Sequence, residues 1–502
     1  VSRHRRCHQT QPRMHDEPRF LQQVDNETLL RRVIPLRCGS GGDQVAVAAD
    51  QERCPGPSYR DIVSRDIGGV PPQMLESEYA FRGDEPIGFD RYTSEDFLKS
   101  EFDRVWSRTW QWACREEHIP NEGDFHVYDI GDRSILIVRS ADMKIRAFNN
   151  FCLHRGTQLK PSNTTGNANR FTCPFHGWAW STSGKLATIP CRWDFPHVKD
   201  EDFELPEIQV DTWGGFVFVN FDPHAQSLHE YLGVMTRHFT GTWDLSQRYI
   251  EIHVRKRLPA NWKAAMEAFL EAYHVFKTHP EALRATGDAN AQYDVFGEHV
   301  SRFMHTSGSQ SPHIAAQQTE QEILNFMIGR KFSGGVNIPQ VPEGHTARDV
   351  YSAFVQQQLK EKYGHDFSDF KVSETIDSIE YFVFPNGFFF PGAHKPMVYR
   401  FLPHPTNPDE CTFDLLFLRF PADGQAPPPP AQPYDIDIHE SYMSAPGIDQ
   451  GLGYVYDQDT DNMAAQTRGF KGSMRTSQVS GNYQEIRARH LHQTIDAYLA
   501  RP

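Results

Sequence analysis

Two short motifs in the first half of the chain each pair one cysteine with one histidine. Cys152 and His154 stand in "NNFCLHRG", and Cys173 and His176 stand in "CPFHGWAW", with eighteen residues between His154 and Cys173. Two thiolates and two imidazoles can hold a metal, provided that the two motifs meet on neighbouring tight turns. This requirement constrains the fold of the segment more than any other feature of the sequence.

The order of the ligands separates this pattern from a zinc finger. A zinc finger groups two cysteines and then two histidines, whereas each motif here supplies one ligand of each kind. A [2Fe–2S] cluster with two cysteines on one iron and two histidines on the other fits this interleaving. Gly156 and Gly177 would let the backbone turn closely around such a cluster. A structural zinc site, or four unrelated residues in a β domain, remain the alternatives at this point.

Composition and charge limit the class of protein. The chain has 502 residues, of which 38% are apolar and 23% charged, as is usual for a soluble globular protein of several structural units. Its net charge of −14 argues against nucleic acid as a partner. There is no apolar run long enough to predict a membrane span. Eight cysteines and the lack of a visible secretory signal favour reduced thiols in the cytoplasm.

The residue patterns predict four regions. Residues 1–74 are rich in arginine, histidine and turn residues, and we expect a disordered or atypical N-terminal extension. Residues 75–112 predict a helical lead-in that packs on the domain at 231–502. Short alternating strands predict an all-β domain over 113–230, and 231–502 mix strands with helices, including a helix over 261–279. The fold class expected is α+β.

A second group of metal ligands is suggested by "AYHVFKTHP". His274 and His279 are five residues apart, about 140° around a regular helix, so a straight helix cannot direct both side chains at one ion. A π-bulge or a helix end would allow it, and Pro280 supplies a reason for an end. Two histidines and one carboxylate leave open positions on Fe(II) for O2 and substrate. The third ligand would come from an acidic cluster near the C-terminus, which offers Asp457, Asp459 and Asp461.

At these residues the chain resembles the α (catalytic) subunits of the Rieske non-heme iron aromatic-ring-hydroxylating oxygenases. "CLHRG" and "CPFHGW" match the motifs of that family closely, although the eighteen-residue loop between them is slightly long. The resemblance covers roughly residues 75–502. It implies an all-β Rieske [2Fe–2S] domain followed by an α+β, helix-grip-like catalytic domain with an antiparallel sheet.

The resemblance also implies roles for particular residues. Asp459 becomes the carboxylate ligand, because Gly469 follows it ten residues later, as in the family. An acid at the position of Glu271 connects the Rieske histidine of a neighbouring subunit to the iron ligand, with Glu267 as the alternative. The cluster ligands are then Cys152, His154, Cys173 and His176, and the mononuclear iron ligands are His274, His279 and Asp459.

The activity implied is that of a terminal oxygenase. Electrons from an NAD(P)H-dependent reductase, with or without a ferredoxin, reach the Rieske cluster and then a mononuclear Fe(II), where oxygen from O2 enters an aromatic or related hydrophobic substrate. The chain shows no strand–G-x-G-x-x-G–helix pattern, so the reductase is expected to be a separate protein.

The type of reaction, the assembly and the class of protein each have alternatives. Ring cis-dihydroxylation is favoured over monooxygenation with O- or N-demethylation or hydroxylation. The expected assembly is a homotrimer or a multiple of it, with or without a small β-subunit. An electron-carrying Rieske protein and a zinc-binding module are the alternatives from other classes.

Overall fold

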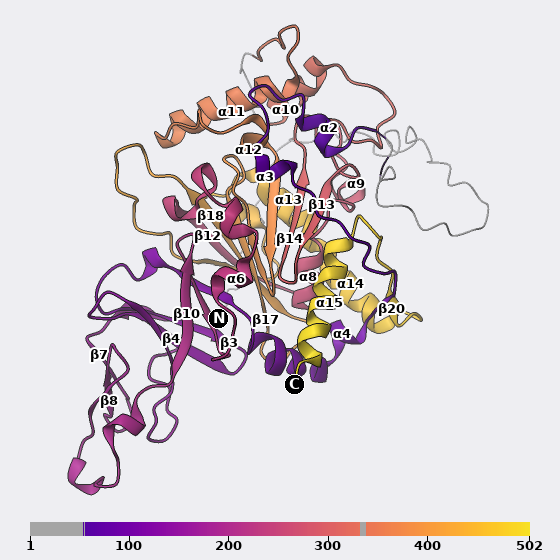
Figure 1. Ribbon diagram of the computed structural model, residues 1–502. Helices are drawn as coiled ribbons and strands as arrows, with labels where there is room; N and C mark the ends of the chain where they lie inside the picture. The colour runs from indigo at the N-terminus through magenta and orange to yellow at the C-terminus, as the bar shows by residue number, and fades with distance from the viewer. Residues whose placement is uncertain (1–53, 55, 332–337) are drawn as a thin grey trace, which may run out of the picture.

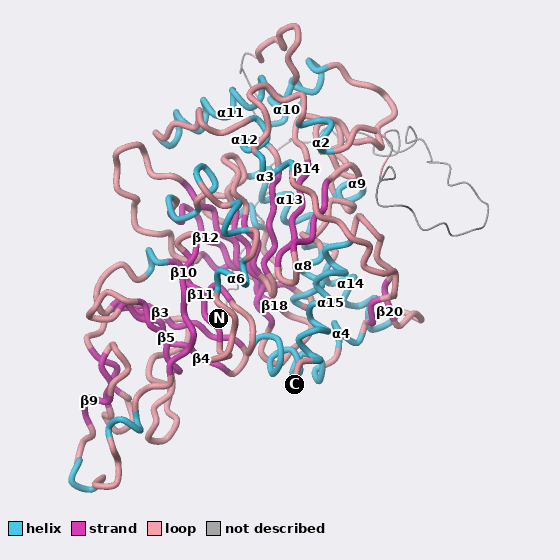
Figure 2. The backbone as a smooth tube through the Cα atoms, viewed as in Figure 1, coloured by secondary structure: helices cyan, strands magenta, loops and turns pink. Residues whose placement is uncertain are grey.

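The computed structural model describes residue 54, residues 56–331 and residues 338–502. Figure 1 shows an all-β unit, which we call the β unit (residues 111–220), beside a larger unit built around a long sheet with helices packed on it. Figure 2 shows the same division, with strands dominating the β unit and helices gathered around the larger one. Within the described residues, none of the helices has the length and apolar character that crossing a bilayer requires.

The β unit contains two sheets. A seven-stranded antiparallel sheet has the order β2-β11-β10-β5-β4-β3-β6, and a three-stranded sheet has the order β7-β8-β9. The strands are β2 (Gln111–Arg115), β3 (Asp124–Ile130), β4 (Arg133–Arg139), β5 (Ile145–Asn149), β6 (Thr165–Asn167), β7 (Arg170–Thr172), β8 (Ala179–Ser181), β9 (Leu186–Thr188), β10 (Glu207–Trp213) and β11 (Phe216–Asn220). The small sheet lies at the end of the β unit away from the larger unit (Figure 1).

The larger unit is organised by an eight-stranded sheet of order β13-β14-β15-β16-β17-β18-β12-β19, antiparallel except for the parallel pair β12 and β19. Its strands are β12 (Tyr249–Leu258), β13 (Gln292–Phe296), β14 (Val300–His305), β15 (Ser378–Val383), β16 (Gly387–Phe389), β17 (Met397–Pro403), β18 (Cys411–Arg419) and β19 (Tyr434–Ile436). Strand β15 is buried on both faces and carries the buried Glu380 among apolar residues.

Helices and one further strand pair complete the structure. The helices are α2 (Tyr59–Val63), α3 (Pro72–Leu75), α4 (Asp90–Thr93), α5 (Glu95–Glu101), the π-helical turn η1 (Phe102–Trp106), α6 (Leu228–Leu232), α7 (Met235–His238), α8 (Trp262–Glu267), α9 (Val275–Thr278), α10 (Glu320–Lys331), α11 (Ala347–Tyr363), α12 (Val372–Ile376), α13 (Gln450–Asp461), α14 (Met463–Gly472) and α15 (Ile486–Ala500). Short 3₁₀ turns are η2 (Glu116–His118), η3 (Arg192–Asp194), η4 (Asp200–Phe203), η5 (Gly241–Trp243), η6 (Leu245–Gln247) and η7 (Tyr442–Ser444). Strands β1 (Ile87–Gly88) and β20 (Ser477–Gln478) pair with each other.

The two faces of the eight-stranded sheet pack against different partners. Alternate residues of a strand point to opposite faces, so Phe382 of β15 joins a core with α8, α13 and α15, whereas Tyr381 joins a core with α2, α6 and α7. The lead-in helices lie on the first side, where Trp106 meets Trp262 of α8 edge-on with ring centroids 5.0 Å apart. The sheet is therefore the scaffold from which α8, α9 and α13 are positioned.

The sequence predicted a disordered or atypical extension over residues 1–74, but the structure contains two short helices, α2 and α3, toward the end of this stretch. Residues 1–53 lie outside the described residues, but α2 and α3 are ordered against α12 and contribute Tyr59 and Met74 to the core. Asp66 forms a buried, bidentate ion pair with Arg348 of α11 at 2.7 and 2.8 Å, and Arg348 also binds Asp377. A buried ion pair with a partner nearly three hundred residues away leaves no local pattern in the sequence.

The helix expected over 261–279 is broken. Asn261 caps α8, which ends at Glu267, and a non-helical turn over 268–274 precedes the short helix α9. No glycine or proline lies within 262–279, so local propensity alone would continue the helix. Tertiary contacts override that propensity.

The packing of α15 predicts a loss of stability in acid. His299 is 5% exposed and its ring bonds Tyr498 of α15 at 2.9 Å. Burial, with help from Arg501 and His490, lowers the pKa of His299 to about 3. The unfolded chain has a histidine pKa of about 6.5, so the stabilising contribution is present above that pH and is lost as the pH falls, by about 2 kcal/mol at pH 5.

Thermal unfolding at pH 7.5 and pH 5 would measure this effect. We expect a His299→Gln variant to lose less stability between the two pH values than the wild type, because glutamine does not titrate. Equal losses in both proteins would contradict the assignment to His299.

Candidate metal centres

The two motifs with cysteine and histidine form loops of the same design. In each loop the N–H of the cysteine donates to the carbonyl five residues later, and its carbonyl accepts from the N–H of the glycine four residues later. The distances are 2.8 and 2.9 Å for the loop at Cys152, and 2.7 and 3.1 Å for the loop at Cys173. Gly156 and Gly177 have φ of +77° and +75°, a conformation that glycine adopts readily and other residues rarely. Each loop thus closes its own backbone hydrogen bonds.

The strands place the two loops side by side. The second loop joins β7 to β8, and the first follows β5 and is closed by a bridge between Phe151 and Gln158. Both cysteines are buried in one apolar core together with Trp178 and Trp180. Both loops are therefore positioned by the small apolar core of the β unit on which they pack.

The two histidines of these loops face each other. The ring centroids of His154 and His176 are 4.7 Å apart, and His154 stacks on Trp178 at 4.9 Å with the planes nearly parallel. The Nδ1 atoms of both histidines are buried and have no hydrogen-bond partner in the protein. A buried polar atom without a partner is costly, so two such nitrogens beside two thiols fit a metal cluster that would bind them.

The thiols beside these histidines are suited to be ligands. The Cys152 thiol is hydrogen-bonded to the Cys173 sulfur. Burial raises the pKa of Cys173, but N–H groups of Phe175 and His176 outweigh it and hold the pKa below its usual value. A thiolate is the form that binds metal, so the second loop is prepared to present one. The donor set therefore fits the [2Fe–2S] cluster that the resemblance implies.

His274, His279 and Asp459 form the second group. One ligand atom from each lies within 4.8 Å of the others, and within the described residues this is the one set of three such side chains found so close together. Asp459 Oδ1 lies 2.7 Å from Nε2 of His279 and 3.5 Å from Nε2 of His274. All three side chains are mostly or largely buried. Two imidazoles and a carboxylate are the donor set for a non-heme Fe(II) with open positions.

The two histidines lie at the two ends of the short helix α9. The N–H groups of Thr278 and His279 donate to the carbonyls of His274 and Val275 at 2.8 and 3.0 Å, so the single turn between the histidines is helical. Their ring centroids are nevertheless 5.4 Å apart. The helix ends before Pro280 as predicted, and the break before His274 separates this turn from α8. Asp459 reaches the pair from α13.

Each histidine has a partner on its other nitrogen. Glu271 accepts from His274 Nδ1 at 2.8 Å and from the His274 backbone N–H at 2.9 Å. Gln458 accepts from His279 Nδ1 at 2.9 Å. We assign the Nδ1–H tautomer to both rings from these bonds, which leaves Nε2 of each for a metal. Gln458 was not foreseen in the sequence, where only its position beside Asp459 marks it.

Electrostatics at this group favour a cation. Burial lowers the pKa of His274, but the charges of Glu271 and Asp459 outweigh it and raise the pKa to about 10. Burial raises the pKa of Asp459, and the two imidazoles hold it below its usual value instead. Two carboxylates thus stabilise positive charge here, which a divalent metal would supply.

The alternative acids are engaged elsewhere. Asp457 accepts from the Tyr442 N–H at 2.9 Å and from the Ser441 hydroxyl, on another side of α13. Asp461 is exposed. Glu267 binds His492 at 2.7 Å and Tyr92 at 2.6 Å. None of the three is brought to the histidine pair.

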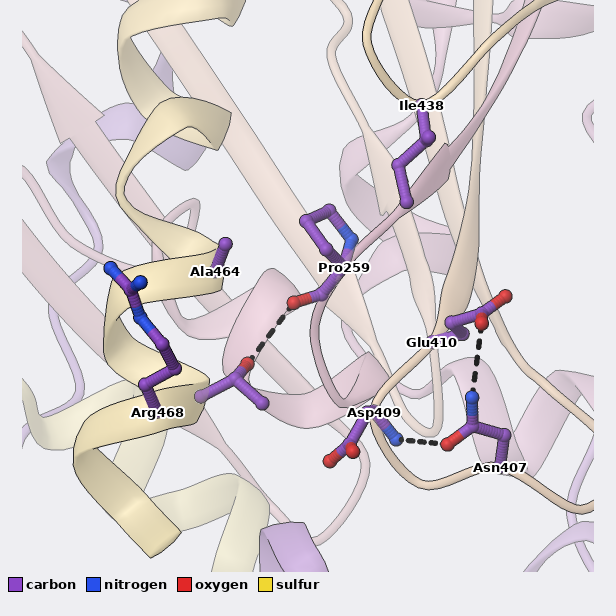
Figure 3. A pocket seen from close by; sticks show the side chains of 8 residues that line it. Pro259, Asn407, Asp409, Glu410, Ile438, Ala464 and Arg468 are labelled. Carbon is purple, nitrogen blue, oxygen red and sulfur yellow. Dashed lines mark hydrogen bonds between the residues drawn. The ribbon is translucent and has the colours of Figure 1, made fainter. Parts of the chain in front are cut away.

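Two surface grooves are separate from these groups. The groove in Figure 3, of about 460 Å³, lies beside α14, where the Thr467 hydroxyl donates to the Pro259 carbonyl at 3.1 Å. A second groove of about 800 Å³ lies near Glu76, Arg237 and Phe296. Neither is lined by a predicted ligand, so neither adds to the candidate metal centres.

The hydrogen bond from Gln458 leads to a prediction. A Gln458→Leu variant is expected to bind Fe(II) about tenfold more weakly, because the His279 ring loses the partner that fixes its tautomer and orientation. Competition with a coloured Fe(II) chelator would measure the affinity. Gln450→Leu, on the same helix, is the matched control and should bind as the wild type does. Equal affinities in all three proteins would contradict the role of Gln458.

Comparisons with known families match both halves of the chain. Residues 109–199 match the model of the Rieske [2Fe-2S] domain. Residues 240–501, slightly more than half of the chain, match the model of the ring hydroxylating alpha subunit, catalytic domain. The two matches follow each other in the order in which the two groups of ligands occur.

Individual relatives agree with these matches. Biphenyl 2,3-dioxygenase subunit alpha from Rhodococcus jostii (strain RHA1) is 33% identical over 220 residues, which are 42% of this chain and 48% of that protein. The carnitine monooxygenase oxygenase subunit of Escherichia coli (strain K12) is 30% identical over 190 residues, 38% of this chain and 50% of that protein. The chain thus spans about half the length of the curated relatives it matches.

A solved structure shows the same fold. Naphthalene 1,2-dioxygenase from Rhodococcus sp. bound to indole superposes with a TM-score of 0.54 at 20% identity, over 83% of this chain and 95% of that one. The all-β domain and the α+β domain with its antiparallel sheet are therefore as predicted. From the motifs, the two domain matches and the fold together, the chain belongs to the family of ring-hydroxylating α subunits, with a Rieske [2Fe–2S] domain ahead of a mononuclear iron catalytic domain.

Proposed function

We propose that this protein is a terminal oxygenase that uses electrons and O2 to oxidise an aromatic or related hydrophobic substrate, with ring cis-dihydroxylation as the main reaction. The observation that carries the proposal is the presence, in one chain, of the paired loops and of the group formed by His274, His279 and Asp459. An electron carrier would need only the first. A zinc-binding module would need neither the second group nor its open coordination positions.

Seven side chains would hold the two metal centres. Cys152, His154, Cys173 and His176 hold the [2Fe–2S] cluster, and His274, His279 and Asp459 hold the mononuclear iron. When bound, the cluster supplies single electrons, and the iron supplies the place where O2 is activated. Trp178, stacked on His154, excludes water from one side of the cluster ligands.

Glu271 holds the proton of His274 Nδ1 and fixes the direction in which Nε2 points. The side chains of Glu271 and His274 are 11% and 24% exposed, so this edge of the site is open at the surface of the single chain. We infer that the Rieske domain of a neighbouring subunit approaches Glu271 here, in a homotrimer or a multiple of it. Glu271 would then connect the two centres through hydrogen bonds.

The remaining partners follow from the same proposal. An NAD(P)H-dependent reductase, with or without a ferredoxin, would reduce the cluster, and a small β-subunit would accompany the chain or be absent. We place the enzyme in the cytoplasm, where its thiols remain reduced.

A second candidate reaction, monooxygenation, is supported by one of the relatives. The carnitine monooxygenase oxygenase subunit is 30% identical to the chain, while biphenyl 2,3-dioxygenase subunit alpha is 33% identical. Dihydroxylation consumes O2, two electrons and two protons and places both oxygen atoms in the product. Monooxygenation places one oxygen atom in the product and releases the other as water.

A single turnover with ¹⁸O2 separates the reactions. The protein is loaded with iron, reduced with dithionite, freed of excess reductant and exposed to ¹⁸O2 with biphenyl, chlorobenzene, salicylate or carnitine. A product with two labelled oxygens supports dihydroxylation, and a product with one supports monooxygenation. Reoxidation of the cluster without any labelled product from this panel would contradict the proposed substrate class, and failure to bind Fe(II) would contradict the oxygenase function itself.

A further inference from the structure

The turn over 268–274 carries Glu271 and His274. Its first residues make i→i−3 backbone bonds, at Phe269 and Leu270, but the N–H groups of Ala272 and His274 are bound by side chains. Backbone N–H and C=O groups that are buried must find other partners, or their burial is costly. The N–H of His274 is bound by the Glu271 carboxylate at 2.9 Å. Two further groups of the turn, the carbonyl of Leu270 and the N–H of Ala272, flank Glu271 on either side. Their partners are side chains from distant parts of the chain.

Arg487, from the first turn of α15, binds the Leu270 carbonyl. Its Nη1 donates to that oxygen at 3.1 Å, and its Nε donates to the Ser301 hydroxyl at 3.0 Å. The guanidinium is fully buried and forms an ion pair at 2.8 Å with Glu380 of β15, which is itself 3% exposed. Nη1 thus contacts both the Leu270 carbonyl and Glu380, while Nε binds Ser301, and these contacts tie the turn to β14 and β15.

Tyr293, from β13, binds the N–H of Ala272. The hydroxyl accepts from that N–H at 2.9 Å and donates to Oε1 of Gln484 at 3.3 Å. The Gln484 amide in turn donates to the Ala289 carbonyl at 2.7 Å. The Tyr293 side chain is fully buried. The turn is therefore held on both sides of Glu271, once from β13 and once from the start of α15.

We propose that Tyr293 and Arg487 are positioning residues that hold the ligand turn out of the helical conformation and so set the affinity of the site for its metal. The inference rests on the proposed function, because it takes His274 as a ligand. Neither side chain is within the group of metal ligands. Each acts on the backbone that carries Glu271 and His274, and through it on the direction of His274 Nε2.

The physical reason is the strong local preference for a helix. The segment from Trp262 to His279 has no residue that breaks a helix, and its last turn, between His274 and His279, is helical already. With the side chain of Tyr293 or Arg487 altered, the turn over 268–274 gains access to helical conformations. Such conformations would move Glu271 away from His274 and shift His274 relative to Asp459. Only the fraction of molecules with converged ligands binds the metal tightly, so the apparent affinity falls with that fraction.

The test measures Fe(II) affinity rather than turnover. Purified protein that keeps its [2Fe–2S] cluster is stripped of mononuclear iron by a chelator without O2, and Fe(II) is titrated back against a coloured chelator. The variants are Tyr293→Phe, which loses only the hydroxyl, and Arg487→Lys, which keeps the charge. Visible absorption of the cluster and thermal unfolding are recorded for each protein.

The other face of the same sheet offers matched controls. Tyr381 and Arg302 are fully buried, and they bond each other at 3.1 Å. Arg302 pairs with Asp294 at 2.7 Å and binds the Glu76 carbonyl. Tyr381→Phe and Arg302→Lys therefore disturb burial and hydrogen bonding to a similar degree, away from the ligand turn.

We expect Fe(II) affinity to fall about tenfold or more in Tyr293→Phe and Arg487→Lys, as for other residues that orient metal ligands, with the cluster spectrum unchanged. The two controls should keep the wild-type affinity even where their thermal stability falls. Provided that the wild-type protein binds Fe(II), two results would overturn the inference. One is wild-type affinity in both Tyr293→Phe and Arg487→Lys, and the other is an equal loss of affinity in the two controls. A wild-type protein that bound no Fe(II) would instead overturn the proposed function and the inference with it.

Discussion

An Asp459→Ala variant is expected to lose its mononuclear iron and all product formation while it keeps the [2Fe–2S] cluster. Among the described residues, Asp459 is the carboxylate that lies between the two imidazoles, at 2.7 and 3.5 Å from their Nε2 atoms. Its removal takes away one of three ligands and the negative charge that balances the metal. Since the loss of an orienting partner alone costs up to about 100-fold in affinity, the loss of a ligand should exceed that. Iron should fall from about three to about two atoms per chain.

The neighbouring carboxylates are the controls for this result. Asp457→Ala removes an acid that bonds Tyr442 and Ser441, and Asp461→Ala removes an exposed one. Both variants should retain about three iron atoms per chain and form product. Iron loss in Asp457→Ala or Asp461→Ala, with full retention in Asp459→Ala, would reverse the assignment of the carboxylate ligand.

A Cys173→Ser variant is expected to lose the cluster and with it every electron that reaches the second site. The Cys173 sulfur is held in the apolar core of the β unit, where it is hydrogen-bonded to the Cys152 thiol and to backbone N–H groups of its own loop. A serine hydroxyl does not ionise at neutral pH and is a poor ligand for the soft iron of the cluster. The visible absorption and the inorganic sulfide should disappear, and iron should fall to about one atom per chain.

Two other thiols serve as controls for this variant. Cys191 is exposed in the same domain, and Cys114 is buried in β2. Cys191→Ser and Cys114→Ser should both remain coloured and active. A coloured Cys173→Ser protein with a normal sulfide content would show that a different residue completes the cluster.

The parts of the fold that were predictable are those with a local signal. Each of the two cysteine–histidine motifs has its ligands, a turn glycine and flanking strands within a few residues. The motifs and their flanking strands were therefore enough to predict the β domain. The antiparallel strands from 378 to 419 have long apolar runs with clear turns between them. Asp459 was one of three acids until the resemblance selected it, and the structure brings the same residue to His279.

The rest could not be read from the sequence because it depends on contacts between distant residues. The break at 268–274 has no glycine or proline, and the partners of its backbone come from β13 and α15. Gln458 is an ordinary residue on a helix until His279 is folded against it. In the same way, the ion pair that joins Asp66, just after α2, to Arg348 of α11 links residues that are far apart in the sequence. Long-range polar contacts of this kind have no period that a sequence pattern reveals.

The matching hydrogen bonds of the two loops around Cys152 and Cys173 have a consequence for chain length. Since each loop closes on itself, the connection between them does not determine how either cysteine is presented. Extra residues at the exposed turn around Asn163 would mainly add closure entropy, which grows by only about 0.6 kcal/mol for each doubling of loop length. That turn is consequently a tolerant point for inserting an affinity tag without altering the ligands of the cluster.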